Sequence, residues 1–326
     1  MRVEPISPPV SLDDVVAARE AIGRRLHRTP TFTSRLLSEE SGARVHLKAE
    51  LFQRTGSFKP RGVLTSLASL SDDEKARGVI GISAGNHAAA LAYGAAQEGV
   101  PALLVMWRDA SAQKVEATRA YGAEVDLTAA GPAEAFDRLD ELIAESGRTL
   151  VHPFDSPTTI AGQGTVALEV LEDVPDADVV VVPIGGGGLI SGIATVVKAR
   201  RPETRVIGVE PERSNAFHLA LAAGEPVPIT PESIADGLNA PFAGTVALAQ
   251  SRDLVDEVVL VSEEEIAAAT RFLYARAKLA CEPAGAATTA ALRSGKLSYE
   301  QGESIVVVVS GGNVATETAV AILSGR

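Results

Sequence analysis

The chain of 326 residues contains a single cysteine, Cys281, and therefore cannot form an internal disulfide. This composition is typical of proteins that stay in a reducing compartment. The sequence also lacks an apolar run approaching the roughly 20 residues that a membrane helix needs. Its first residues show no basic flank followed by an apolar core, so no secretory signal is visible. We therefore expect a cytoplasmic protein that has no membrane partner.

Basic residues are fewer than acidic ones, 30 against 42, which gives a formal net charge of -12. A field of this sign repels nucleic acid and anionic membranes, although it is compatible with a locally basic pocket for a small anion. Hydrophobic residues make up 46% of the chain and charged residues 22%, as in soluble globular proteins. The length exceeds what one compact core usually supports, so we expect two lobes.

Short apolar runs alternate with helical patterns along the chain. The apolar runs are residues 79–82, 102–106, 149–151, 179–184, 206–209, 258–261 and 305–309. The helical patterns include residues 11–26, 87–98, 113–121, 133–145 and 264–279. Several apolar runs lack polar alternation, as do strands that are buried on both faces of a parallel sheet. The alternation predicts an α/β fold with parallel sheets covered by helices, in which residues 72–154 could form a lobe of their own.

Four consecutive glycines follow the apolar strand pattern within residues 178–192, DVVVVPIGGGGLISG, and a helix pattern comes next. Glycines let backbone N–H groups converge on an anion, and a helix N-terminus adds partial positive charge. This segment predicts a phosphate-binding loop, with a tight strand-to-helix turn as the alternative. It does not match G-x-G-x-x-G, and the chain has no G-x-x-x-x-G-K-[ST], so dinucleotides and nucleoside triphosphates are disfavoured.

Lys59 lies between Phe58 and Pro60 in the segment TGSFKPRG. A lysine that is desolvated there, close to Arg61, would have a lowered pKa and could act as a nucleophile. Considered alone, a solvated surface lysine is the stronger interpretation, because most lysines in such loops are solvated. Ser310 similarly ends an apolar run in the segment VVVVSGGN and, without context, could simply cap a turn.

Residues 81–85, GISAG, match the G-x-S-x-G nucleophile elbow of serine hydrolases with Ser83 as the nucleophile. In that fold the catalytic histidine follows the serine and the acid, typically late in the chain. The histidines here are His27, His46, His87, His152 and His218, and nothing after His218 could serve. The chain also has no His-Gly-Gly-Gly motif for an oxyanion hole. The hydrolase hypothesis is therefore the weaker one.

Taken together, these segments resemble the threonine dehydratase and serine racemase branch of the fold-type II (tryptophan synthase β-like) enzymes, which depend on pyridoxal 5′-phosphate (PLP). The matching elements cover nearly the whole chain in order. They are SFKPRG at 57–62, SAGNH at 83–87, KVEATRAYGAEV at 114–125, IAGQGTVALEV at 160–170, GGGGL at 185–189, IADGL at 234–238, EPAGAA at 282–287 and SGGNV at 310–314.

The resemblance implies two open, mostly parallel twisted sheets covered by helices, with the cofactor in the cleft between a large lobe (1–71 and 155–326) and a small lobe (72–154). It implies that Lys59 forms the Schiff base with PLP and that the loop of residues 83–87 binds the substrate carboxylate, using Ser83 and main-chain amides. The other residues implied to contact the cofactor are Phe58, Asn86 for the 3′-oxygen, Gly185, Gly186, Gly187, Gly188 and Leu189 for the phosphate, and Ser310 for the pyridine nitrogen. Relatives are commonly homodimers or homotetramers.

The implied reaction is dehydration and deamination of a small β-hydroxy amino acid, most simply L-threonine or L-serine, to a 2-oxo acid and ammonia. A neutral Ser310 hydroxyl would make the ring a milder electron sink than an aspartate would, which favours prompt β-elimination. Racemases of this branch carry a serine beside the position of Ser83, whereas this chain has Ala84, which disfavours racemisation. Racemisation, or dehydration of another 3-hydroxy amino acid, stays an alternative, as does a silent PLP carrier.

The family's cation site is only partly matched. Glu210 corresponds to one acid of that site and Ser214 could offer its carbonyl, but Ala216 replaces the second acid. A monovalent or divalent cation at Glu210 is therefore a prediction on incomplete ligands, and a solvated glutamate after a strand is the alternative. Trp107 stands where dehydratases commonly have proline. It could pack at the surface of the small lobe or reshape the entrance to the site.

Overall fold

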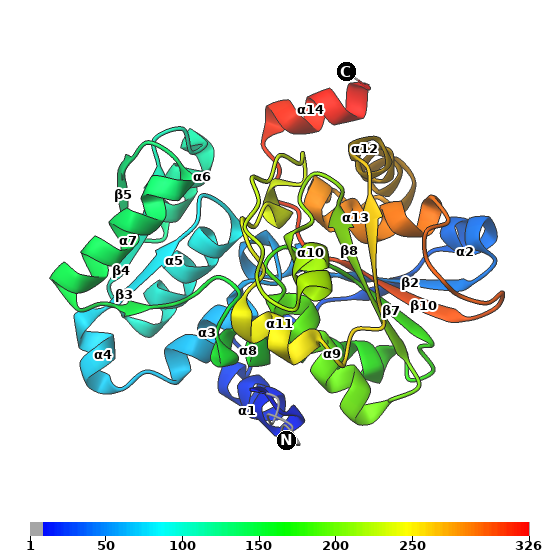
Figure 1. The fold of residues 1–326 in the computed structure, drawn as a ribbon, viewed down its shortest axis with the longest axis horizontal. Coiled ribbons are helices and arrows are strands. Elements are labelled where there is room, and N and C mark those ends of the chain that lie inside the picture. The colour runs from blue at the N-terminus through cyan, green and yellow to red at the C-terminus, as the bar shows by residue number, and fades with distance from the viewer. Residues whose placement is uncertain (1–8, 326) are drawn as a thin grey trace.

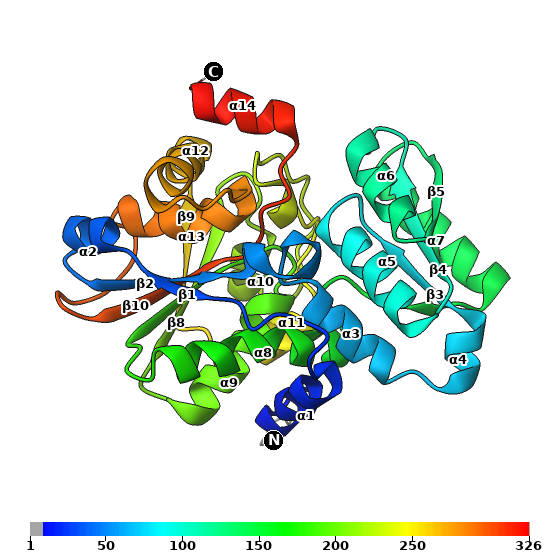
Figure 2. The ribbon, with the colours of Figure 1, turned by 180° about the vertical axis from the view of Figure 1, so that it is seen from behind.

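The computed structural model describes residues 9–325 and contains two separate sheets (Figures 1 and 2). The larger sheet has six strands in the order β1-β2-β10-β7-β8-β9, and the smaller has four in the order β5-β4-β3-β6. Only the β1–β2 pairing is antiparallel among the described strands. The prediction of two mostly parallel sheets covered by helices is confirmed. The strands are β1 (Thr31–Thr33), β2 (Arg44–Ala49), β3 (Val79–Ile82), β4 (Ala102–Trp107), β5 (Glu124–Ala129), β6 (Thr149–Leu150), β7 (Val179–Pro183), β8 (Arg205–Pro211), β9 (Glu257–Val261) and β10 (Ser304–Val309).

The helices cover both sheets. In Figure 1 the smaller sheet lies at the left with α5, α6 and α7, the larger sheet lies at the right, and α3 and α8 lie between them. The α-helices are α1 (Leu12–Ile22), α2 (Arg35–Ser41), α3 (Pro60–Ala68), α4 (Asp72–Arg77), α5 (Asn86–Glu98), α6 (Ala112–Ala120), α7 (Pro132–Ser146), α8 (Pro157–Asp173), α9 (Gly188–Arg200), α10 (Ala216–Ala223), α11 (Thr245–Ser251), α12 (Glu263–Phe272), α13 (Pro283–Arg293) and α14 (Thr316–Ser324). Shorter turns are η1 (Glu50–Phe52), η2 (Arg54–Gly56), η3 (Asp236–Leu238) and the π-helical η4 (Leu273–Ala277).

The central strands of the larger sheet are buried on both faces, as the unalternated valine runs predict. In β7, Val180 and Val182 pack in one hydrophobic core cluster, while Val179 and Val181 pack in the cluster on the opposite face. The valines of β10 alternate between the same two clusters. Two apolar layers therefore fix the register of the strands, because a slip by one residue would exchange the faces.

The structure differs from the sequence expectations at several element ends. The first helix ends at Ile22 rather than continuing to residue 26, because Gly23 has φ 56° and its N–H closes the helix on Arg19. Strands β1, β2 and β5 were not expected, since β1 is very short and the other two carry charged residues. Trp107, whose role the sequence left open, packs against a core cluster of the smaller sheet beside α7.

The carboxyl ends of parallel strands position the candidate site, as is usual in open α/β folds. Residues 83–86 follow β3, the glycine loop follows β7, and Ser310 follows β10. Lys59 directly precedes α3, which lies between the sheets. Across residues 9–325, each helix is too short or too polar to cross a lipid bilayer.

Candidate active site

Lys59 occupies the N-cap position of α3, with Pro60 as the first helical residue. Its amine donates a hydrogen bond of 2.8 Å to the carbonyl oxygen of Pro153 and lies 5.1 Å from the centre of the Phe58 ring. Burial lowers the pKa of this amine to about 8, although the charge of Glu282 partly opposes the shift. A large fraction of a lysine with this pKa is neutral near pH 8, and a neutral amine is the form that attacks a carbonyl.

The glycine loop turns sharply between β7 and α9. Gly187 has φ 97°, in the left-handed region, and serves as the N-cap of α9. A Cβ on Gly186 would lie 2.3 Å from the ring of Phe154, and one on Gly187 would lie 2.3 Å from the ring of Phe217. Among the described residues, no hydrogen bond is donated by the backbone N–H groups of Gly185 through Leu189. Close packing demands glycine at this turn, and the N–H groups stay available, so phosphate binding stays a prediction for this loop.

The segment around His152 joins Lys59 to the glycine loop. Pro153 accepts the hydrogen bond from Lys59, and the next residue, Phe154, packs on Gly186 and Gly188. The ring of His152 stacks edge-on against Phe154 with centroids 4.7 Å apart. The lysine and the loop thus lie on either side of one short segment, as the prediction of a shared cofactor site requires.

Ser310 lies against the segment that carries Lys59. Its carbonyl oxygen accepts a hydrogen bond of 3.1 Å from the N–H of Phe58, and Ser57 pairs with Gly311 in an isolated bridge. Ser310 is 3% exposed, and its hydroxyl has no hydrogen-bond partner among residues 9–325. A hydroxyl without a protein partner is available to a ligand atom.

Asn86 is linked to two residues to which the sequence assigned no role. Its Nδ2 donates 2.7 Å to Oε1 of Glu282, and its Oδ1 accepts 2.8 Å from Nδ2 of Asn313. Asn313 also donates 2.6 Å to the carbonyl of Thr55, which has an unusual φ of 61° for a β-branched residue. The motifs EPAGAA and SGGNV contain both residues, but nothing in the sequence shows that they meet Asn86.

Glu282 is a buried carboxylate beside the site, only 2% exposed. Burial raises its pKa to about 8, with a further contribution from the negative charge of Asp236. A Cβ on Gly311 would lie 2.3 Å from its Oε1, so glycine is required there for space. The carboxyl group and the Lys59 amine both have pKa values near 8, so proton exchange around this site is expected to be sensitive to pH in that range.

Ser83 lacks the partners of a hydrolytic nucleophile. Its hydroxyl accepts a hydrogen bond of 3.0 Å from the N–H of Gly85. The nearest candidate bases are engaged elsewhere: His87 donates from Nε2 to the carbonyl of Val151 at 2.9 Å, and Nδ1 of His152 accepts from the backbone N–H of Asp155 at 2.8 Å. Among the described residues no histidine is hydrogen-bonded to Ser83, so the geometry does not support the hydrolase hypothesis.

The side chain of Glu210 forms hydrogen bonds with the backbone in this structure. Its two carboxylate oxygens accept hydrogen bonds of 2.9 and 2.7 Å from the N–H groups of Phe217 and His218, in the first turn of α10. Burial raises its pKa to about 8. Within residues 9–325, no group of three or more His, Cys, Asp or Glu side chains is arranged to hold a metal ion. Glu210 is thus buried rather than solvated, and the cation stays a prediction without further support.

A pocket of about 370 Å³ opens between α5, α6 and the segment after β10. Gly85, Asn86, Lys114 and Asn313 are among its lining residues. The amine of Lys114, on α6, forms an ion pair with Asp236 in η3, on the other side of the cleft. The loop that the sequence assigns to the substrate carboxylate therefore borders a cavity large enough for a small amino acid.

These residues fit PLP on structural grounds. The site has an amine of lowered pKa, free N–H groups at a helix N-terminus for a phosphate, and the Ser310 hydroxyl, which forms no hydrogen bond to another described residue. The family of pyridoxal-phosphate dependent enzymes matches residues 22–311 of the chain. The chain belongs to this family.

The names of the relatives that this chain resembles refer to threonine or serine. The L-threonine ammonia-lyase of Thermotoga maritima is 42% identical over 306 residues, 94% of this chain and 76% of that protein. The catabolic L-threonine dehydratase of Escherichia coli strain K12 is 42% identical over 308 residues, which are 94% of each chain. Maize serine racemase superimposes with a TM-score of 0.92 at 38% identity and covers 97% of this chain and 98% of its own. The resemblance inferred from the motifs is confirmed.

Proposed function

We propose that this chain binds PLP on Lys59 and removes water and ammonia from a small β-hydroxy amino acid, L-threonine or L-serine, giving a 2-oxo acid. The observation that carries the proposal is the partly buried Lys59 amine, which lacks a carboxylate partner among residues 9–325 and is linked through Pro153 and Phe154 to the glycine loop. The named activities of the relatives support the same reaction class. We also propose a cytoplasmic homodimer or homotetramer with lobes at 1–71 with 155–326 and at 72–154.

In this proposal the chain supplies binding and proton transfer. PLP, when bound, acts as the electron sink for the pair of electrons left at the substrate Cα. The N–H groups of Gly185 through Leu189 hold the cofactor phosphate, and Phe58 packs beside it. The Lys59 amine accepts the Cα proton in its neutral form, which its pKa of about 8 makes available near neutral pH.

The loop after β3 orients the substrate. We propose that the substrate carboxylate binds at residues 83–87, through the Ser83 hydroxyl and the N–H groups at the start of α5. Asn86 holds the cofactor oxygen, with Glu282 and Asn313 fixing its amide. Ala84 offers no group for proton transfer, so the opposite face of Cα receives no proton from this position. This favours elimination over racemisation.

Ser310 then tunes the reaction. Its uncharged hydroxyl can share a hydrogen bond with the pyridine nitrogen, but it cannot hold that nitrogen protonated as a carboxylate would. With Ser310 at that nitrogen, bound PLP would be a milder electron sink, which would favour loss of the β-hydroxyl over competing reactions. The released enamine takes up water and yields one 2-oxo acid and one ammonia.

The test is a visible absorption titration of the purified protein with L-threonine and then L-serine, with 2-oxo acid and ammonia measured in the same samples. We expect a yellow protein whose band changes with one of the two and equimolar release of both products. A band that responds to neither, with no product, would indicate a different amino acid or a silent carrier. Labelling of Ser83 by a fluorophosphonate in a colourless protein would instead support the hydrolase.

A further inference from the structure

A second pocket lies away from the Lys59 cleft, where α1 meets α8. It has a volume of about 290 Å³, large enough for a small metabolite. Figure 2 shows α1 running beside α8 on the side of the large sheet opposite α12 and α13. The charged and histidine side chains that line the pocket are Arg19, Arg24, His27, Arg28, Arg61 and Glu169.

The lining has a positive excess, with four arginines against one glutamate. The whole chain carries a formal charge of -12, so this concentration of arginine in one concave place runs against the overall field. Ile22 and Leu26 contribute apolar lining, and the segment around Gly23 turns the chain so that Arg24 and His27 also line the pocket. Such a concave arginine cluster attracts anions more strongly than a flat surface does.

Some of these basic side chains have no acidic partner in the described part of the chain, and others form exposed ion pairs that a ligand could replace. Arg19 and Arg28 both pair with Glu172, and these side chains are between 40% and 49% exposed. Exposed pairs of this kind contribute little to stability, so they can exchange partners at little cost. Arg24 and His27 are exposed, and neither forms an ion pair with another described residue.

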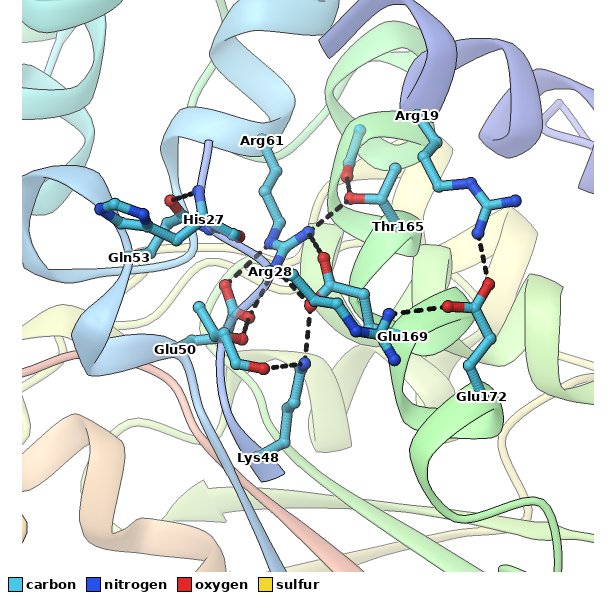
Figure 3. Close-up of polar contacts among 12 residues, drawn as sticks. Arg19, His27, Arg28, Lys48, Glu50, Gln53, Arg61, Thr165, Glu169 and Glu172 are labelled. Carbon is cyan, nitrogen blue, oxygen red and sulfur yellow. Dashed lines mark hydrogen bonds and ion pairs between the residues drawn. The ribbon is translucent and has the colours of Figure 1, made fainter. Parts of the chain in front are cut away.

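The floor of the pocket belongs to a buried network, shown in Figure 3. Arg61 is 2% exposed and donates to both oxygens of Glu50 and of Glu169, at 2.8 to 3.0 Å, and to Thr165. Lys48 completes the network with 2.6 Å to Glu169. Two cations and two carboxylates balance one another there, and a further carboxylate, Asp173, lies 3.8 Å from Lys48 and pairs with Arg28.

We propose that this pocket binds a small dianion, a phosphate or a dicarboxylate, through Arg24, Arg28 and His27, and that its occupancy is transmitted to the active site through Arg61. Arginine matches such groups because its planar fork binds two oxygens at once. Arg61 is two residues from Lys59 in the same first turn of α3. A ligand that shifts the network therefore shifts the helix end that positions the lysine.

The binding test is isothermal titration calorimetry of the PLP-loaded protein with orthophosphate and, separately, malonate, at constant ionic strength because charge attraction is screened by salt. We expect a Kd on the order of 1 mM or below for at least one of them. Arg24→Gln and Arg24→Gln/Arg28→Gln should weaken binding roughly tenfold, about the effect of one lost charged hydrogen bond. Orthophosphate alone binding indicates a phosphate site, and malonate alone indicates a carboxylate site.

The matched control is Arg213→Gln, which changes an exposed arginine paired with Glu232 outside the pocket. It should bind the anion as the native protein does. Failure of both probes to bind, or equal binding by the native and Arg24 variants, would overturn the site. The transmission is tested by the visible absorption of the bound cofactor as a function of pH, with and without saturating anion. A shifted midpoint supports it, and an unchanged midpoint overturns it, whatever the substrate of the enzyme proves to be.

Discussion

Two lysines on neighbouring segments of this chain, one fully buried and one partly buried, have opposite environments. Lys48, in β2, is fully buried and forms ion pairs with Glu169 at 2.6 Å and Asp173 at 3.8 Å, together with a hydrogen bond to the carbonyl of Thr29. Lys59 contacts a single carbonyl, that of Pro153, and has no carboxylate within ion-pair distance among residues 9–325. The amine of Lys48 therefore has carboxylate partners, whereas the amine of Lys59 has none among the described residues.

The difference separates a structural lysine from a chemical one. A buried amine with carboxylate partners stays charged and holds segments together. A buried amine without them has a lowered pKa and is available as a nucleophile or base. The same rule explains why Lys59, which is partly buried and has no carboxylate partner among the described residues, can be assigned a chemical role while Lys48 is structural.

The largest effect is expected from Lys59→Ala. Without this amine, the chain has neither the covalent attachment point for PLP nor the base for the Cα proton, so we expect 2-oxo acid release to fall by about 10³-fold or more. The measurement is product formation from L-threonine and L-serine at saturating PLP. The control is Lys75→Ala on α4, outside the cleft, which should retain native activity. Deamination by Lys59→Ala at the native rate would contradict the assignment.

Lys48→Met should act on stability. It leaves the Glu169 carboxylate buried with one partner fewer, and breaking a buried pair costs about 3–5 kcal/mol of the free energy of unfolding. Urea unfolding measures this cost. The double variant Lys48→Met/Glu169→Gln removes the charge imbalance. Its loss should be smaller than the sum of the two single losses, and strict additivity would show that the two residues are not coupled.

His87 is a second basic side chain that has no acidic partner among residues 9–325, and it is buried. Burial lowers its pKa from 6.5 to about 3, helped by the nearby charge of Lys59. The unfolded chain binds this proton below pH 6.5 and the folded chain does not, so stability is lost as the pH falls from about 6.5 towards 3. At pH 5 this one residue accounts for about 2 kcal/mol. In His87→Asn, the drop in unfolding free energy between pH 7 and pH 5 should shrink by that amount. An unchanged drop would mean that His87 is protonated in the native protein.

Ser310→Asp tests how a negative charge beside the pyridine nitrogen of the cofactor changes the reaction. A carboxylate in this place would hold the pyridine nitrogen protonated and strengthen the electron sink. We expect β-elimination to slow by roughly tenfold relative to competing reactions such as transamination, which is about 1.4 kcal/mol. The measurement is the ratio of 2-oxo acid to aminated cofactor, with Ser310→Ala as the uncharged control. An unchanged ratio in the aspartate variant would contradict the role given to the hydroxyl.

The sequence predicted those parts of the molecule that depend on neighbours along the chain. The valine runs of β7 and β10, the four glycines before α9 and the segment around Lys59 each contain their own signal, and the structure places them together. The sequence could not reveal what depends on neighbours in space. Glu282 accepts a hydrogen bond from Asn86, which is 196 positions away in the sequence. The carboxylate of Glu210 accepts a hydrogen bond from a backbone N–H in the first turn of α10. The compensation of Lys48 likewise depends on Glu169 from a distant helix.

The most direct test of the contrast between the two lysines is borohydride reduction of the PLP-loaded protein, which makes the bond between the cofactor and its lysine permanent, followed by peptide mass spectrometry. The account predicts that the cofactor is recovered on the peptide containing Lys59 and that the peptide containing Lys48 is unmodified. Recovery of the cofactor on any other lysine, with Lys59 unmodified, would contradict it.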